Sequence, residues 1–321
     1  MPWLGSTRSL LLQPVRGHRR SGALPVRQCR RRWSSSPSPL RVLLHQHIAG
    51  EDGPEGLVSY DAAEDIQQRH RLEFLRHKQL SREQRDGADA PRPRLLSFES
   101  MPTFTLGRRQ QDLNGAQKAL LERELVINLP QRRVPVRGTL KPCVRKTDRG
   151  GLTTYHGPGQ LVLWPIIDMH SPLYPNFGVA SYANHLEVTT QRLLADCFGI
   201  KTKTLHDEPG VWVVDSSSST PGQHPQRKIA ALGVHHRRHV TGLGIAVNID
   251  MVVSGTEQVN PWSRFVPCGL EGKTATSVAS ELANGAANVT WDLQKLANRW
   301  AVIFEQGLFD VSKRGTDTRT A

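Results

Sequence analysis

Cys268, which stands between a proline and a glycine in Pro267-Cys268-Gly269, is the side chain of this sequence best suited to covalent chemistry. Such neighbours place a thiol in a turn or at a loop tip, where solvent and substrate reach it. A free cysteine is only a few per cent thiolate at neutral pH, so a nucleophile needs an activating group nearby. The other interpretation is a small buried apolar side chain, which is common for a lone cysteine.

Lys228 and His156 are the candidates for an activating or binding group. Lys228 opens the apolar run 228–234. As an ammonium ion close to a cysteine it would favour the thiolate, and as a neutral amine it would carry protons; otherwise it is a solvated surface charge. His156 either braces its loop by hydrogen bonding or belongs to a site. The other histidines lack a metal-like arrangement with nearby acids and are predicted to lie on the surface, among them His235, His236 and His239.

A glycine-rich run from Arg149 to Gln160 precedes an apolar stretch of strand length, Leu161 to Asp168. Its glycines allow positive φ and a close approach of backbone to a ligand, and a buried strand after it would fix the loop on a rigid scaffold. The alternative is an ordinary glycine-rich turn. The run matches neither a GxGxxG fingerprint nor a Walker A sequence, so it does not indicate nucleotide binding.

The charge of the chain is concentrated at its beginning. The 321 residues carry a net charge of +13, and residues 1–40 contain eight arginines, no lysine and no acid. This Arg-rich, Ser-rich composition predicts a mitochondrial transit peptide over residues 1–33, and hence a matrix protein; a disordered basic tail or a nucleic-acid-binding arm is the alternative. Subtracting these eight charges from +13 leaves +5, which is too little for a polynucleotide-binding surface.

The cysteines and the hydropathy exclude further classes. Cys29, Cys143, Cys197 and Cys268 are far apart, so no CxxC pair is available for zinc or redox chemistry. Cys197 lies at helical spacing with apolar residues and is predicted to be core. No apolar window is long enough for a membrane span.

The elements that must position these groups alternate irregularly, which predicts an α+β (mixed α/β) domain over residues 40–310 with a disordered tail at 311–321. Capping-box residues Asp61 and Glu64 are expected to start the first helix. Two segments are interpreted as loops or insertions: the basic stretch 131–146 and the serine-rich 215–227. Strands are expected at 40–48, 95–100, 104–106, 211–215, 228–236 and 239–249; helices at 61–80, 117–125, 179–198, 276–282 and 293–304; and a loop at 81–94.

Taken together, four blocks resemble the octanoyl-[acyl-carrier-protein]:protein N-octanoyltransferases, or lipoyl(octanoyl) transferases, in a mitochondrial form. The blocks are 149–160, 228–233, 244–248 and 267–269, and a weaker match is 104–107. The resemblance implies the fold of lipoate and biotin protein ligase catalytic domains, a mixed β-sheet flanked by helices. It also implies transfer of an octanoyl group from the phosphopantetheine of acyl carrier protein to a lysine of lipoyl-domain proteins. These acceptors are the glycine cleavage H protein and the E2 subunits of 2-oxoacid dehydrogenases.

The same resemblance implies roles for individual residues. Cys268 matches the acyl-thioester nucleophile, and Lys228 matches the residue that lowers the pKa of that thiol and transfers protons. No metal and no separate cofactor is implied. The substrate-binding positions that match are Arg149, Gly150, Gly151, Leu152, Thr153, Thr154, Tyr155, His156, Ala231, Leu232, Gly233, Gly244, Ile245 and Ala246.

The sequence departs from the family at Leu243, where the family usually has histidine. The basic segment is interpreted either as a site for an acidic carrier protein or as a charged disordered loop; its charges are Arg132, Arg133, Arg137, Lys141, Arg145 and Lys146. The alternative functions are an ATP-dependent lipoate or biotin ligase, a cysteine hydrolase and a non-catalytic carrier-protein-binding module. The cysteine in its Pro-Cys-Gly setting argues against a ligase, and the presence of both Cys268 and Lys228 argues against a non-catalytic module.

Overall fold

The computed structural model describes residues 42–50, 56–132, 135–214, 226–265, 273–282 and 290–310. The predicted transit peptide, most of the serine-rich segment, Cys268 with its neighbours, and the C-terminal tail all lie outside the described residues.

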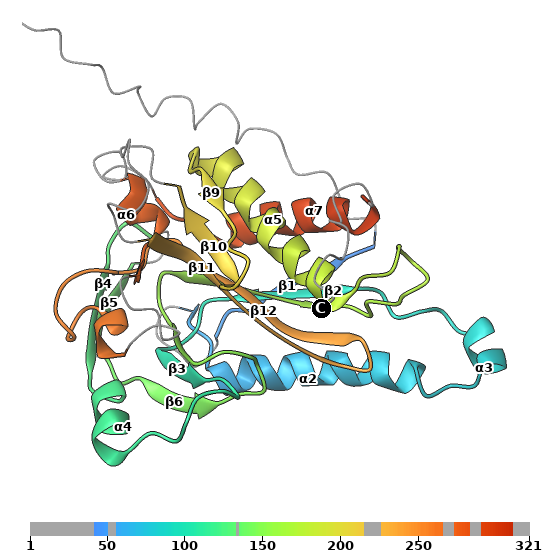
Figure 1. Cartoon of the computed structure of the whole chain (residues 1–321), viewed down its shortest axis with the longest axis horizontal. Coiled ribbons are helices and arrows are strands. Elements are labelled where there is room, and N and C mark those ends of the chain that lie inside the picture. Colours follow the sequence, from blue (N-terminus) through green and yellow to red (C-terminus); the bar gives the residue numbers. More distant parts are fainter. Residues whose placement is uncertain are drawn as a thin grey trace, which may run out of the picture.

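A mixed eight-stranded sheet forms the centre of the molecule (Figure 1). Its order is β1-β2-β8-β12-β11-β10-β9, and β13 pairs with β11. Every residue of β8 and β12 is buried, because helices cover both faces of the sheet at these central strands. The strands of this sheet are β1 (Leu44–His47), β2 (Arg94–Phe98), β8 (Gln160–Ile166), β9 (Thr202–Lys203), β10 (Gly210–Val213), β11 (Gln226–Arg237), β12 (Val240–Asn248) and β13 (Lys273–Ala275).

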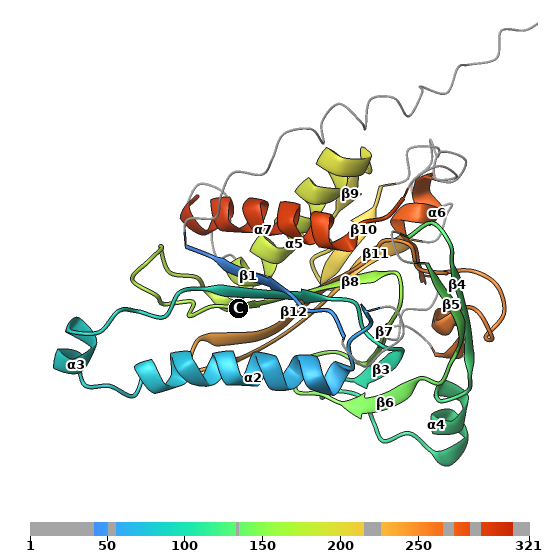
Figure 2. The same ribbon diagram turned by 180° about the vertical axis from the view of Figure 1, so that it is seen from behind.

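Three long helices cover the sheet: α5 (Val179–Phe198) and α7 (Leu293–Phe309) on one face, and α2 (Tyr60–His77) on the other (Figure 2). Trp300 of α7 is fully buried and donates from Nε1 to Thr190 Oγ1 of α5 at 3.0 Å. Burial of each large apolar side chain here contributes about 1.5–3 kcal/mol. The expected mixed α/β class is confirmed. No helix in the described ranges is long and apolar enough to cross a membrane.

The first turn of α2 differs from the prediction. Ser59 is the N-cap, and its hydroxyl accepts the Ala62 amide at 3.2 Å. Asp61 lies inside the helix and forms an ion pair with Arg145. The capping box expected of Asp61 and Glu64 is therefore wrong, because a hydroxyl two residues earlier satisfies the free N–H groups.

The segment predicted as a loop after α2 contains a short helix, α3 (Arg82–Asp86). Ser81 and Gln84 form its capping box, each side chain accepting the other residue's amide. Two other short helices, α4 (Gly115–Leu121) and α6 (Val278–Leu282), lie close to their predicted positions.

A second, three-stranded sheet has the order β6-β3-β7, and β4 pairs with β5 in a separate hairpin. The segment 131–146, interpreted as an insertion, contains β5 and β6. Pro135 and Pro142 stand directly before these strands, where a missing N–H is tolerated. The glycine-rich run is likewise not all turn, since it contains β7. The bounds are β3 (Thr103–Leu106), β4 (Leu125–Leu129), β5 (Val136–Leu140), β6 (Cys143–Lys146) and β7 (Thr153–His156).

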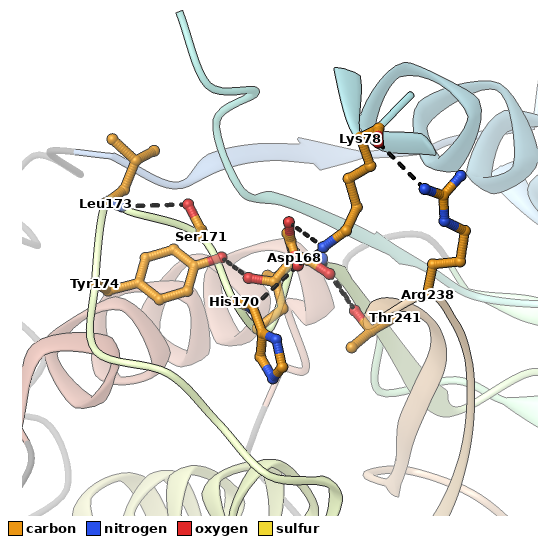
Figure 3. Close-up of polar contacts among 9 residues, drawn as sticks. Lys78, Asp168, His170, Ser171, Leu173, Tyr174, Arg238 and Thr241 are labelled. Atoms are coloured by element: carbon orange, nitrogen blue, oxygen red, sulfur yellow. Dashed lines mark hydrogen bonds and ion pairs between the residues drawn. The ribbon is translucent and has the colours of Figure 1, made fainter. Parts of the chain in front are cut away.

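The β11–β12 hairpin is joined to the end of α2 by the polar contacts drawn in Figure 3. Lys78 donates from Nζ to both carboxylate oxygens of Asp168 at 2.6 Å, and its carbonyl oxygen accepts from Arg238 at 3.2 Å. Thr241 Oγ1 accepts the Ile167 amide at 2.9 Å. These contacts fix the turn of the hairpin whose two strands form a wall of the cavity described below.

Arg132 is not a surface cation. It forms a buried, two-pronged ion pair with Glu99, which also accepts the amide N–H of Gly159 in the glycine-rich run. The basic set expected to meet a carrier protein is thus partly engaged elsewhere. Arg145 pairs with Asp61, Lys146 with Asp112, and Arg133 lies outside the described residues, while Arg137 and Lys141 are exposed.

Replacing Arg132 with methionine should lower the free energy of unfolding by about 3–5 kcal/mol, because the Glu99 carboxylate is left buried without its partner. Chemical denaturation monitored by tryptophan fluorescence measures the change. Arg137→Met, an exposed arginine of the same hairpin, is the matched control and should stay within about 0.5 kcal/mol of the unchanged protein. Equal effects of the two substitutions would contradict the structural role of the ion pair.

Candidate active site

A cavity of about 400 Å³ lies between the small sheet, α2 and the central strands β11 and β12, a volume typical of small-molecule sites. It collects most of the residues that the sequence singled out. Leu152, Thr153 and Tyr155 do not line it, and Cys268 lies outside the described residues. The lining residues are Tyr60, Arg109, Arg149, Gly150, Gly151, Thr154, His156, Trp164, Asp207, Glu208, Pro209, Lys228, Ala231, Leu232, Gly233, Val234, Leu243, Gly244, Ile245 and Ala246.

Arg149 joins the two sheets beside this cavity. Its guanidinium is buried and donates to Thr105 Oγ1 of β3 at 3.0–3.1 Å, to the Thr105 carbonyl, and to the Gly150 carbonyl at 3.0 Å. Its aliphatic part lies on β11, where a Cβ at Gly233 would come within 2.9 Å of Arg149 Cδ. Gly233 is therefore required by the packing of Arg149, and these guanidinium donors are bonded to the protein itself.

His156 belongs to a directed chain of buried side-chain amides. The Thr276 carbonyl can only accept, so it receives Asn248 Nδ2–H at 2.9 Å. Asn248 Oδ1 then accepts from Gln160 Nε2 at 2.9 Å, and Gln160 Oε1 faces His156 Nδ1 at 2.7 Å. Because Gln160 Oε1 has no proton to give, Nδ1 of His156 carries the hydrogen and donates it.

The pKa of His156 is lowered to about 4, chiefly by burial; the Gln160 hydrogen bond opposes this effect, and the nearby Arg149 charge adds a smaller lowering. The ring is therefore neutral at physiological pH, and Nε2 carries the lone pair. His156 contributes a hydrogen-bond acceptor to the cavity wall and no positive charge. An unfolded histidine takes up its proton near pH 6.5, so the buried neutral ring reduces native stability as the pH falls from about 6.5 toward 4.

Lys228 brings a cation to the cavity from the start of β11. Its Nζ donates to the Pro209 carbonyl at 3.2 Å and lies 4.5 Å from the centre of the Trp212 ring, its cross-strand neighbour. On the other side, β13 runs parallel to β11, with Ala275 opposite Lys228. Lys228 is thus held between the cavity and the strand that follows the Pro-Cys-Gly segment.

Sequence reasoning missed several contributors. Gln160 and Asn248 stand in the matched blocks but received no role; their amides at the ends of apolar strands are the signal that could have singled them out. Tyr60, whose ring lies 5.6 Å from that of His156, and Trp164 had no local signal. Among the described residues, no group of histidine, cysteine, aspartate and glutamate could hold a metal ion.

The model of the lipoyl protein ligase A/B catalytic domain matches residues 74–303. A probable octanoyltransferase of Schizosaccharomyces pombe is 32% identical over 236 residues, 72% of this chain and 85% of that protein. The mitochondrial octanoyl-[acyl-carrier-protein]:protein N-octanoyltransferase LIPT2 of Danio rerio is 32% identical over 227 residues, 71% and 80% of the two chains. The crystal structure of P. falciparum LipL1 in complex with lipoate has a TM-score of 0.44 at 12% identity and covers 84% of this chain and 64% of that chain.

The mixed sheet, the cavity along β11 and β12 and the family match define a catalytic domain of the lipoyl ligase type, and the chain belongs to the lipoyl protein ligase A/B catalytic domain family. Within this family, the chain is similar in sequence to octanoyltransferases, at 32% and 38% identity to two of them. It is an octanoyltransferase, and thus an acyltransferase.

Replacing Gln160, whose Oε1 accepts the hydrogen of His156 Nδ1, should allow His156 to adopt either neutral tautomer. In the unchanged protein, ¹⁵N-histidine NMR should show His156 as the Nδ1–H tautomer at pH 7 and still neutral at pH 5, because its pKa is about 4. In Gln160→Leu the Nδ1–H form should no longer dominate.

Gln79→Leu, at an exposed glutamine near the end of α2, is the control and should leave the His156 signals unchanged. A His156 that titrates near pH 6.5 in the unchanged protein would contradict the arrangement described here.

Proposed function

We propose that this octanoyltransferase moves its acyl group from the phosphopantetheine thiol of acyl carrier protein to a lysine amine of lipoyl-domain proteins, through a thioester on Cys268. The acceptors are the glycine cleavage H protein and the E2 subunits of 2-oxoacid dehydrogenases. The observation that carries the proposal is the position of β13. This strand begins five residues after Cys268 and pairs with the stretch of β11 that ends at Lys228, beside a largely apolar cavity.

In the first half-reaction the Cys268 thiolate attacks the carbonyl carbon of the octanoyl thioester. The bond from that carbon to the pantetheine sulfur breaks, and the pantetheine leaves as a thiolate that takes up a proton. One thioester replaces another, so little free energy is gained or lost. The step requires the thiolate of Cys268, and a nearby ammonium group such as that of Lys228 favours it.

In the second half-reaction the lysine amine of the lipoyl domain attacks the same carbonyl, and Cys268 leaves as a thiolate. An amide replaces a thioester, so this step is downhill. The incoming lysine is an ammonium ion at neutral pH and must lose a proton before it attacks. Lys228 in its neutral form is the proposed acceptor of that proton, and its contacts with Pro209 and Trp212 support a fixed position for it.

Substitutions at Lys228 should separate its two roles. In Lys228→Ala, the pH at which Cys268 alkylates should rise by about one unit, because a nearby cation is lost. In Lys228→Arg the positive charge remains but does not deprotonate. Acylation of Cys268 should then be partly retained, while transfer to the lipoyl domain falls. Intact-mass analysis of enzyme and acceptor after incubation with octanoyl carrier protein, without ATP, measures both steps.

Lys203→Arg is the matched control, because Lys203 is the other cross-strand neighbour of Trp212 and is exposed; it should leave both steps unchanged. Cys268→Ser should abolish the adduct, and Cys143→Ser should retain it. Absence of an octanoyl adduct on the peptide containing Cys268 would refute the covalent mechanism, and a strict requirement for ATP would instead favour a ligase.

The N-terminal composition supports a mitochondrial location for this activity. Residues 1–40 carry eight arginines and no acid, and they close with Arg30-Arg31-Arg32-Trp33-Ser34, as in a matrix-targeting segment. A relative of similar identity bears the word mitochondrial in its name. We place residues 1–33 in a cleaved transit peptide and residues 40–310 in the catalytic domain.

N-terminal sequencing of the protein purified from cells should begin near Ser34, and the protein should fractionate with the matrix. Replacing the eight arginines with glutamine is the control and should leave the chain uncleaved in the cytosol, because import depends on the positive charge. A mature matrix protein that still begins at Met1 would refute the cleavage.

A further inference from the structure

Leu243 has a left-handed backbone, φ 60°, inside the buried strand β12. The other non-glycine residues with positive φ in the described ranges are Arg238 and His239. These form the tight turn between β11 and β12, where this conformation is usual. A bulky residue with positive φ within a strand is an outlier that costs about 1–3 kcal/mol. The surrounding structure must therefore hold Leu243 in place.

The cause lies in the neighbouring strand. The register of β8 and β12 brings Pro165 opposite Leu243, and proline has no N–H to donate to the ladder. The Pro165 carbonyl accepts Thr241 Oγ1–H at 2.9 Å. The Leu243 amide leaves the ladder and donates to Gln67 Oε1 of α2 at 3.1 Å.

The positive φ reverses the direction of the Leu243 side chain. In a regular strand, residues 243, 245 and 247 would share one face. Ile245 and Val247 lie in the core cluster under α5 and α7, whereas Leu243 packs with Trp164 and Ala246 on the α2 side. It is also one of the residues that line the cavity. The backbone conformation thus places the isobutyl group of Leu243 on the α2 side of the sheet.

We propose that Leu243 is a specificity-determining residue for the acyl group, and that its side chain limits the length of the chain the cavity accepts. The inference rests on the proposed function, because it takes the cavity to be the acyl site. Leu243 is buried in the cluster on the α2 side and also lines the cavity, so its side chain would meet an acyl chain bound there.

Gln67 is the positioning residue in this arrangement. It is buried, its Oε1 holds the Leu243 amide, and its Nε2 has no hydrogen-bond partner among the described residues. Gln67 Nε2 cannot donate to the Leu243 side chain, since an isobutyl group offers no acceptor. We expect a polar side chain at position 243 to offer Gln67 Nε2 the acceptor that leucine lacks.

Three substitutions test the role of Leu243. Leu243→Ala removes apolar volume from the wall, and the ratio of kcat/KM for decanoyl over octanoyl carrier protein should rise roughly 10-fold, since each further methylene is worth about 0.8 kcal/mol. Leu243→Asn is nearly isosteric, tolerates positive φ and offers Gln67 an acceptor. Its Tm should not fall, while kcat/KM for octanoyl carrier protein should fall roughly 10-fold, because the amide meets the apolar chain.

Val247→Ala is the matched control, since it removes apolar volume from the same strand but does not line the cavity. It should lower Tm without changing the decanoyl-to-octanoyl ratio. The inference is overturned, and the proposed function stands, if Leu243→Ala still transfers octanoyl groups with an unchanged decanoyl-to-octanoyl ratio. The same conclusion follows if the ratio changes by the same amount in Leu243→Ala and Val247→Ala. If the unchanged protein transfers no octanoyl group from carrier protein, the proposed function itself fails.

Discussion

A single directed chain of buried hydrogen bonds connects the main parts of this molecule. It runs from the Thr276 carbonyl through the side-chain amides of Asn248 and Gln160 to His156. Thr276 also donates its amide to the Lys228 carbonyl at 2.9 Å. The chain therefore links β8, β12, the end of β13 and the start of β11. Because every donor and acceptor in it has one possible direction, it fixes both side-chain orientation and the tautomer of the cavity histidine.

The cavity exists because two sheets meet where side chains are absent. Gly233 leaves room for Arg149, and Gly244 leaves room for the Leu163 carbonyl, which would lie 2.2 Å from a Cβ at that position. Arg149 binds β3 while its stem lies on β11. These close approaches leave little space for adjustment, so the same glycines that look like flexibility in the sequence make the wall of the site rigid.

The electrostatics of the cavity depend on which of its charged side chains are already bonded to other groups of the protein. The Arg149 guanidinium is bonded to the protein and His156 is neutral, while Lys228 brings a positive charge to the cavity, which Asp207 and Glu208 also line. Glu208 in turn pairs with Lys273, the first residue of β13. The cavity lining is mainly apolar, and the charged residues that line it are Arg109, Arg149, Lys228, Asp207 and Glu208.

The sequence by itself determined the class of the protein and most of its elements. Apolar runs and helical spacing located β8, β11, β12, α5 and α7, since central strands and amphipathic helices carry their pattern locally. The motif blocks brought Lys228, His156 and the glycines to notice as one family signature. Local pattern failed at the start of α2, where Ser59 competes with Asp61, and at β5 and β6, where prolines hid strand starts.

Only the tertiary structure decided how the remaining side chains are used. Arg132 carries the same sequence signal as Arg137, yet one is buried against Glu99 and the other is exposed. Leu243 reads as an ordinary strand residue, and its reversed side chain depends on Pro165 and Gln67, which lie far away in the chain. The partner that satisfies a buried polar group comes from another element, so no local pattern of residues contains it.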